Sequence, residues 1–201
     1  MSKEPKPEKE VFVIGNGESI KDFNYDFFKD KKSVGTGNIK NDWYPDYYVC
    51  VNLETLKSNL ESIKNMIINK KCEVFLLDAE IIKEWEDILQ YSNVMYIQQL
   101  RGLENNPFRY LIDCCSGSCG VLFAYILGFN KFNLLGMDCP DNEDRFKIHK
   151  KSWEDLRNIL VMYNVLTQEN VELWNYNSNK NLDHCFKSKD IKELEDFELI
   201  E

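Results

Sequence analysis

Short runs of apolar, often β-branched residues alternate along this chain with segments whose apolar residues recur every three or four positions. The first pattern is typical of buried strands, and the second of helices packed on a core. The predicted strands are 11–14, 46–51, 74–77, 94–97, 132–136 and 171–174. The predicted helical segments are 53–67, 81–89, 121–127 and 153–163. Alternation of this kind predicts a single Rossmann-like, doubly wound α/β domain, with a mostly parallel sheet covered by helices on both faces.

The two ends of the chain differ from this middle part. Residues 1–10 alternate Lys, Glu and Pro, and we expect a disordered tail there. The Rossmann-like domain should span residues 11–186. Residues 187–201 are acidic, and Leu194, Phe197 and Ile200 lie three apart, so this segment is either a short amphipathic helix or an acidic tail.

Composition limits the partners and the compartment. The chain of 201 residues has a net charge of −9, which argues against nucleic acid as a partner. It lacks an apolar run long enough for a transmembrane helix, and its first residues do not resemble a secretory signal, so we expect a cytoplasmic protein. Its seven cysteines show no C-x-x-C spacing and it has two histidines, so we expect reduced thiols and no metal site. The oligomeric state stays open, and an oligomer is compatible with the sequence.

In open α/β sheets, ligands bind beyond the carboxyl ends of the strands. The first such loop is Gly15-Asn16-Gly17-Glu18-Ser19. Its glycines allow a sharp turn, and a helix beginning after it would attract an anion. Ile20 stands where a dinucleotide fingerprint has its third glycine. We interpret the loop as ligand-binding, with a plain tight turn as the alternative.

Other polar residues follow later strands. Asn38 and Asn52 could bind a base or a sugar hydroxyl, although asparagine is also common in turns. Ser116, Gly117 and Ser118 precede an apolar helix and suggest a second anion site, unless Ser118 is simply an N-cap.

His149 is the most informative titratable residue. We expect it just before a helix that starts with a capping box, Ser152 with Asp155. The positive end of that helix would lower the histidine pKa, and a neutral imidazole can act as a general base. Arg145 belongs to a basic cluster around His149 that suits a phosphate, with an exposed loop of solvated charges as the alternative. We expect the second histidine, His184, to be structural or on the surface.

Two stretches resemble a known family. VFVIGNGESI resembles the opening strand and loop of the bacterial lipooligosaccharide sialyltransferases of glycosyltransferase family 42, and SGSCGVLFAYILGFNKFNLLGMD resembles their central helix–strand block. The likeness covers about residues 11–52 and 109–186. The same block occurs in a wider Rossmann-like group that includes hydroxymethylpterin pyrophosphokinase-like proteins.

The resemblance implies a set of site residues. Positions that would face the nucleotide, the donor or the acceptor are Gly15, Asn16, Gly17, Ser19, Asn38, Asn52, Ser116, Gly117, Ser118, Asp138 and Asn175. His149 matches the family's catalytic histidine. The family's tyrosines that hold the leaving phosphate have no counterpart in residues 139–146, where Arg145 could replace them.

The implied activity is transfer of a sugar from a nucleotide-sugar to a glycan or other hydroxyl acceptor, with inversion and His149 as general base. CMP-sialic acid is the first candidate donor, and no cofactor or metal is implied. Two alternatives stay open. One is a nucleotide-binding enzyme of phosphoryl or pyrophosphoryl transfer, with Asp138 and Asp141 as its candidate Mg²⁺ carboxylates. The other is a non-catalytic Rossmann-like binding module.

Overall fold

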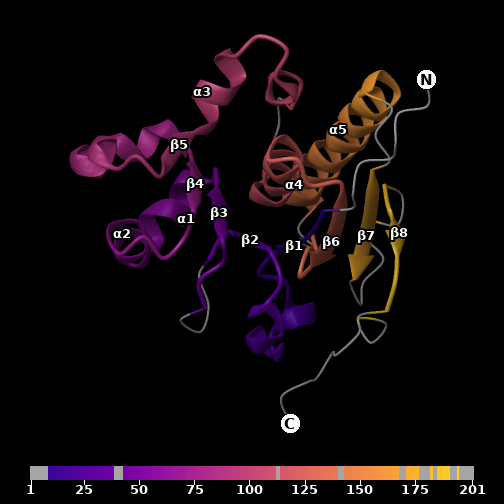
Figure 1. The fold of residues 1–201 in the computed structure, drawn as a ribbon, viewed down its shortest axis with the longest axis horizontal. Helices are drawn as coiled ribbons and strands as arrows, with labels where there is room; N and C mark the ends of the chain where they lie inside the picture. Colours follow the sequence, from indigo (N-terminus) through magenta and orange to yellow (C-terminus); the bar gives the residue numbers. More distant parts are fainter. Residues whose placement is uncertain are drawn as a thin grey trace.

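A computed structural model describes residues 9–38, 43–111, 114–139, 143–167, 171–176, 182, 185–190 and 194. Its centre is one parallel sheet of eight strands in the order β5-β4-β3-β2-β1-β6-β7-β8 (Figure 1). The strands are β1 (Glu10–Ile14), β2 (Ser33–Thr36), β3 (Tyr47–Cys50), β4 (Val74–Leu77), β5 (Val94–Tyr96), β6 (Lys131–Leu135), β7 (Glu172–Tyr176) and β8 (Lys187–Ser188). The predicted parallel α/β fold is confirmed.

Two strands, β2 and β8, were not predicted from the sequence. β2 contains a single large apolar residue, Val34, among Ser, Gly and Thr, so it gives no apolar run. It is nevertheless buried between β1 and β3. β8 is two exposed residues beside β7, inside the stretch assigned above to an acidic C-terminal segment.

The helices also differ in part from prediction. The predicted helix 53–67 is two helices, α1 (Leu53–Ser58) and α2 (Leu60–Ile68), joined at Asn59. The predicted helix 81–89 is wrong, because two 3-10 turns, η3 (Ala79–Lys83) and η4 (Glu86–Gln90), take its place. Ile81 and Ile88 are buried even so, which explains the helix-like spacing. The remaining α-helices are α3 (Ile97–Gly102), α4 (Ser116–Ile126) and α5 (Glu143–Thr167). Among the described helices, none combines the length and the apolar character needed to cross a bilayer.

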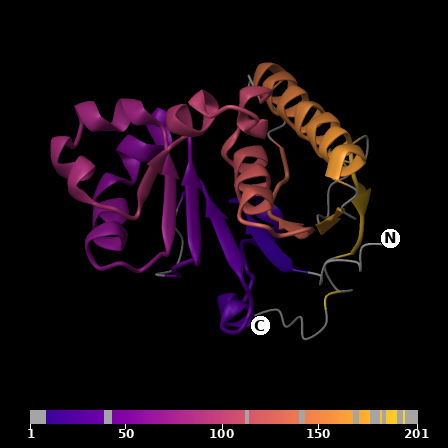
Figure 2. The same cartoon turned by 45° about the horizontal axis from the view of Figure 1, so that its top comes forward.

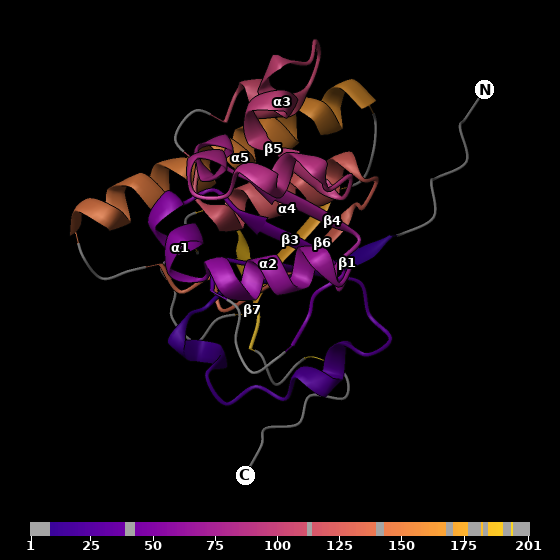
Figure 3. The ribbon, with the colours of Figure 1, turned by 90° about the vertical axis from the view of Figure 1, so that its left-hand side faces the viewer.

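Both faces of the sheet are covered. On one face, Val13, Val34 and Val49 pack in a core with residues of α3, α4 and α5. On the other, Tyr48 and Phe75 pack with α1 and α2. Figure 3, seen from the β5 side, shows α3 above the sheet and the indigo segment after β1 below it. The long helix α5 lies beside α4 (Figure 2).

The connection from β1 to β2 contains no α-helix. Its two 3-10 turns, η1 (Glu18–Ile20) and η2 (Tyr25–Phe28), bring an aromatic cluster under β1. Phe12 of β1 contacts Phe27 and Phe28 with ring centroids 5.4 and 5.6 Å apart. Aromatic packing thus supplies the apolar cover that a crossover helix would otherwise give.

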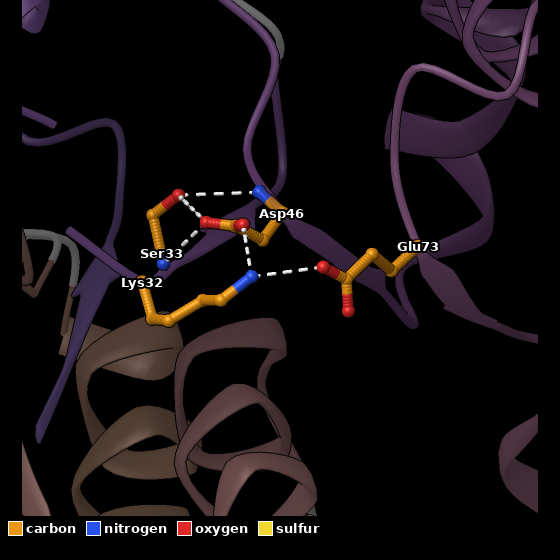
Figure 4. A network of polar contacts seen from close by, with 4 residues as sticks. All are labelled: Lys32, Ser33, Asp46 and Glu73. Atoms are coloured by element: carbon orange, nitrogen blue, oxygen red, sulfur yellow. Dashed lines mark hydrogen bonds and ion pairs between the residues drawn. The ribbon is translucent and has the colours of Figure 1, made fainter. Parts of the chain in front are cut away.

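A polar network holds the amino ends of β2, β3 and β4 together (Figure 4). Lys32 Nζ lies 2.7 Å from Asp46 and 2.8 Å from Glu73. Asp46 also accepts hydrogen bonds from the backbone N–H and the hydroxyl of Ser33. These residues precede or begin their strands, so the network lies at the amino ends of the strands, opposite their carboxyl ends.

Candidate functional site

The sheet reverses its strand order between β1 and β6. The chain runs outward from β1 to β5, then returns through α4 to β6 on the other side of β1. A crevice at such a switch point is where open α/β sheets bind ligands. A cavity of about 770 Å³ lies at this point. It is lined by both glycines of the first loop, by Gly136 and Asp138 after β6, and by the start of α4.

The first loop is locked to the end of β6. Gly15 and Gly17 donate their N–H groups to the carbonyls of Leu135 and Gly136, both at 2.8 Å. Asp138 accepts hydrogen bonds from the backbone N–H of Ser19, at 2.8 Å, and from its hydroxyl. The predicted helix after this loop is wrong, since only the three-residue turn η1 follows it. The loop therefore shapes the cavity wall, while three of its N–H groups are already bonded within the protein.

Close packing explains why the loop needs glycine. A Cβ at Gly17 would lie 2.3 Å from the Asp138 carboxylate, and one at Gly15 would lie 2.4 Å from the Gly136 carbonyl oxygen. Both distances are impossible for real Cβ atoms. The side chain of Asn16 extends from this loop toward β2, where its amide donates to the Thr36 carbonyl at 2.6 Å. Thr36 and Gly37 thereby join the cavity wall.

The start of α4 forms another wall. Ser116 and Gly117 line the cavity, and the Ser116 hydroxyl accepts a hydrogen bond from the Val51 N–H at 3.2 Å. The first four N–H groups of a helix lack intrahelical partners. Here the N–H of Ser118 goes to Cys115 Sγ and that of Cys119 to the Cys115 carbonyl. Ser116 and Gly117, the first two residues of the helix, border the cavity, so their N–H groups are candidate donors to a ligand.

His149 lines the same cavity as Asn16, but not as predicted. It lies in the second turn of α5 instead of preceding a helix, so the predicted helix start at Ser152 is wrong. The helix begins earlier, and residues 143–151 gave no signal for it because they are mostly charged and their two apolar residues, Phe146 and Ile148, lack helical spacing. A helix dipole acts mainly within the first turn, so the dipole argument for His149 loses its basis.

His149 is instead paired with Cys115, the N-cap of α4. Burial alone would raise the pKa of the Cys115 thiol. A hydrogen bond and positive charge from His149, with hydrogen bonds from Ser118, outweigh burial and lower that pKa. The imidazole therefore acts as the donor to the Cys115 sulfur.

Ser152 has a different role from the predicted cap. It is fully buried on α5, and its hydroxyl accepts from the Cys115 N–H at 3.0 Å and lies 2.5 Å from the Ser118 hydroxyl. Ser118 is buried too and does not border the cavity. This hydroxyl pair fixes α5 against the start of α4, and so places His149 beside Cys115.

Several predicted site residues lie elsewhere. Asn175 is inside β7, not in a loop after it; its side chain is fully buried and does not border the cavity. Ser19 donates two hydrogen bonds to Asp138 and does not border the cavity. Asn38 lies off the main cavity, where its side chain accepts from Asn59 at 2.7 Å. Asn52 does line the cavity but also caps α1, accepting from the Thr55 N–H at 2.9 Å.

Three further predicted residues fall partly or wholly outside the described part of the chain. The backbone of Arg145 lies in the first turn of α5, and its side chain is not described. His184 and Asp141 lie outside the described residues.

Other lining residues were not named as site residues from the sequence. These are Thr36, Gly37, Val51, Glu54, Thr55, Cys114, Cys115, Gly136, Met137, Cys139, Ile148 and Trp153, whereas Glu18 belongs to the predicted ligand loop. Several of them follow the carboxyl ends of strands, so the rule that ligands bind there could have found them. Trp153 gave only a core signal, and its ring approaches Gly117, where a Cβ would lie 2.9 Å away.

The charge of the lining is unusual for an anion site. Among the described lining residues there is no Lys or Arg, whereas Glu18, Glu54 and Asp138 are acidic. Within the described ranges, no group of three or more His, Cys, Asp and Glu residues is placed to hold a metal ion. Donors for an anion here are thus backbone N–H groups, side-chain amides and hydroxyls, and His149.

No protein-family model matches the chain, and no curated protein does. Solved structures do match. A sialyltransferase CstII from Campylobacter jejuni, in complex with the substrate analogue CMP-3FNeuAc, aligns with a TM-score of 0.56 and 14% identity, over 96% of this chain and 90% of that one. A CstII variant in complex with CMP aligns with a TM-score of 0.58 and 13% identity, over 96% and 92%. The chain thus has the fold of the CstII sialyltransferases over nearly its whole length.

Proposed function

We propose that the cavity binds a nucleotide-sugar and that the protein transfers the sugar to a hydroxyl acceptor, as a sialyltransferase-like glycosyltransferase. One observation carries the proposal: Asn16, the start of α4 and His149 all border one cavity at the β1/β6 switch point. The structures with the same fold were solved with CMP and with a CMP-sugar analogue. We therefore take CMP-sialic acid as the first candidate donor.

The lining favours a donor with a single phosphate. A pyrophosphate carries more negative charge, and the described lining offers it three carboxylates and no Lys or Arg. A monophosphate ester needs fewer donors, which Ser116, Gly117 and Asn16 can supply. Arg145, at the start of α5, remains our candidate for additional charge at the leaving phosphate.

His149 is the proposed general base. A neutral imidazole has one N–H donor and one acceptor nitrogen. The charged imidazolium that lowers the pKa of Cys115 has two N–H donors and cannot act as a base. The proposed base is the neutral form, which can donate one N–H to the Cys115 sulfur and use the other ring nitrogen to remove a proton from an acceptor hydroxyl. The oxygen then attacks the anomeric carbon through an oxocarbenium-like state, inverting it, as the nucleotide phosphate leaves. Fixed donors at the start of α4 stabilise the growing phosphate charge.

The alternative of pyrophosphoryl transfer has less support. Both carboxylate oxygens of Asp138 already accept hydrogen bonds from Ser19. A Mg²⁺ ion bound there would compete with the contacts that hold the first loop.

A thermal-shift panel tests the proposal. CMP, UMP, GMP, AMP and the corresponding triphosphates are added with and without Mg²⁺. We expect CMP to raise Tm without Mg²⁺; a ligand at 100 times its Kd adds about 2.7 kcal/mol, or roughly 5–10 °C for a chain of this size. A shift that requires Mg²⁺ and a purine triphosphate would instead indicate phosphoryl transfer. No shift with any nucleotide would leave a non-catalytic module as the better account.

A further inference from the structure

Two cysteines meet at the start of α4, beside the cavity. Cys114 precedes the N-cap Cys115, and Cys119 is the fourth residue of the helix. Side chains at these two positions commonly contact each other in a hydrophobic staple. Here both are thiols, and Cys114 packs against the core cluster that contains Cys119. Interaction with the Cys119 thiol is also the largest influence that lowers the pKa of Cys114. The helix start therefore places two thiols as neighbours.

A cation adjoins the outer sulfur. Arg101 of α3 lies with Nη2 3.4 Å from Cys114 Sγ and donates to the Leu111 carbonyl at 2.8 Å. Cys114 borders the cavity and is only partly buried, whereas Cys119 is fully buried in the core. A small molecule in the cavity can reach Cys114 but not Cys119.

The two thiols differ in acidity: the pKa of Cys114 is lowered and that of Cys119 is raised. The interaction with Cys119, aided by the charge of Arg101, outweighs burial and the charge of Asp78 and lowers the pKa of Cys114. Burial, together with Cys114 and Cys115, raises the pKa of Cys119. A thiol beside a cation, with a second thiol as its neighbour, is the arrangement of a reactive cysteine with its resolving partner.

The other described cysteines lack this combination. Burial raises the pKa of Cys72 and Cys139 to about 12 and that of Cys185 to about 11. Burial likewise raises the pKa of Cys50. The pKa of Cys115 is lowered, but its described hydrogen-bond partners are His149 and Ser118 and include no thiol.

We propose that Cys114 and Cys119 form a redox-active dithiol that a peroxide oxidises to an intrachain disulfide. The Cys114 thiolate attacks a peroxide oxygen, so that an S–O bond forms, the O–O bond breaks and the departing oxygen leaves as water after taking a proton. The sulfur of Cys119 then attacks the Cys114 sulfenic acid; the S–S bond forms, the S–O bond breaks, and the hydroxyl leaves as water with the Cys119 proton. Two thiols and one hydrogen peroxide thus give one disulfide and two waters. This chemistry does not depend on the proposed transfer reaction.

The sequence offers a sharp test by peptide mapping. Trypsin cuts after Arg109 and Lys131, and the peptide between them holds Cys114, Cys115 and Cys119. The full-length protein is treated with hydrogen peroxide, alkylated without reduction and digested. We expect this peptide to be lighter by two hydrogens and to carry one alkyl group, and we expect dithiothreitol to restore three alkylatable thiols.

Variants identify the pair. Cys115→Ser should keep the disulfide and lose the last alkyl group, whereas Cys119→Ala should form no disulfide and leave a sulfenic acid on Cys114 that dimedone traps. Arg101→Gln should slow oxidation severalfold, and Cys185→Ser, the matched control, should behave as the wild type. A disulfide that persists in Cys119→Ala, or is lost in Cys115→Ser, would overturn the proposal. So would equal oxidation of Cys185 and Cys114 in the wild type, a result that does not depend on any variant folding.

Discussion

At the residue scale, the cavity is shaped by side chains that satisfy one another. Asp138 illustrates this, because its carboxylate, three residues after the end of β6, accepts hydrogen bonds from Ser19 and fixes the first loop. Gly17 makes that contact feasible by leaving room for the carboxylate. The loop's main role is therefore to hold Asn16 and its own backbone at the cavity.

This packing predicts the effect of one added methyl group. Gly17→Ala should displace Asp138 and lower the free energy of unfolding by about 1–3 kcal/mol, with a loss of CMP binding, because its Cβ would meet the carboxylate at 2.3 Å. Gly102→Ala is the matched control, since nothing lies within 4 Å of a Cβ there. Urea unfolding and CMP titration measure both. Equal stability of the two variants would show that the loop yields freely.

At the scale of elements, the site depends on how α5 meets α4. The buried hydroxyls of Ser152 and Ser118 lie 2.5 Å apart, and Ser152 also accepts from the Cys115 N–H. One turn earlier on the same helix, His149 reaches the Cys115 sulfur. The contact between the two helices thus sets the position of the proposed base.

Removing this contact should affect both stability and the site. We expect Ser152→Ala to lower the free energy of unfolding by about 1–3 kcal/mol, because the Cys115 N–H and the Ser118 hydroxyl lose a buried partner. Ser58→Ala, which removes an exposed hydroxyl bonded within α1, should change it by less than about 0.5 kcal/mol. Chemical denaturation followed by circular dichroism compares them. A Ser152→Ala variant as stable as Ser58→Ala would argue against the contact.

How much the sequence predicts also becomes clear at this scale. Apolar runs such as Val74–Leu77 identify strands directly, since burial on both faces leaves no other pattern. β2 and the first turns of α5 carry no such signal, because a small or charged segment can adopt either structure. The partners of Asp138, Asn52 and Ser118 were equally hidden. Each is a candidate ligand group by type, but only the fold shows that Ser19, Thr55 and Ser152 already engage it.

At the scale of the whole molecule, the carboxyl and amino ends of the strands have separate roles. The carboxyl ends carry the cavity, whereas the network of Lys32, Ser33, Asp46 and Glu73 holds the amino ends of three strands. The hydrogen bonds of Lys32 with Asp46 and, to a smaller extent, Glu73 outweigh partial burial and raise the pKa of Lys32. Stability from a raised lysine pKa is present below the unfolded value of about 10.4 and is lost as the pH rises toward the folded value.

Asp46→Asn tests this separation of roles. Because Lys32 is about half exposed, we expect a loss of only about 1 kcal/mol near neutral pH, with CMP binding unchanged. The difference in unfolding free energy between wild type and variant should shrink as the pH rises above about 10.4. Urea unfolding across that range measures it. A constant difference, or weaker CMP binding, would contradict the account.

The most direct test of the proposed function is cleavage of a CMP-sugar in the presence of a hydroxyl acceptor by the wild type, His149→Gln and the control His184→Gln. If His149 is the general base of a glycosyltransferase, His149→Gln should lower kcat by about 10²–10⁴-fold while CMP still raises its Tm as in the wild type. His184→Gln should retain wild-type turnover. Unchanged turnover in His149→Gln, or no turnover by the wild-type protein despite CMP binding, would contradict the proposed function.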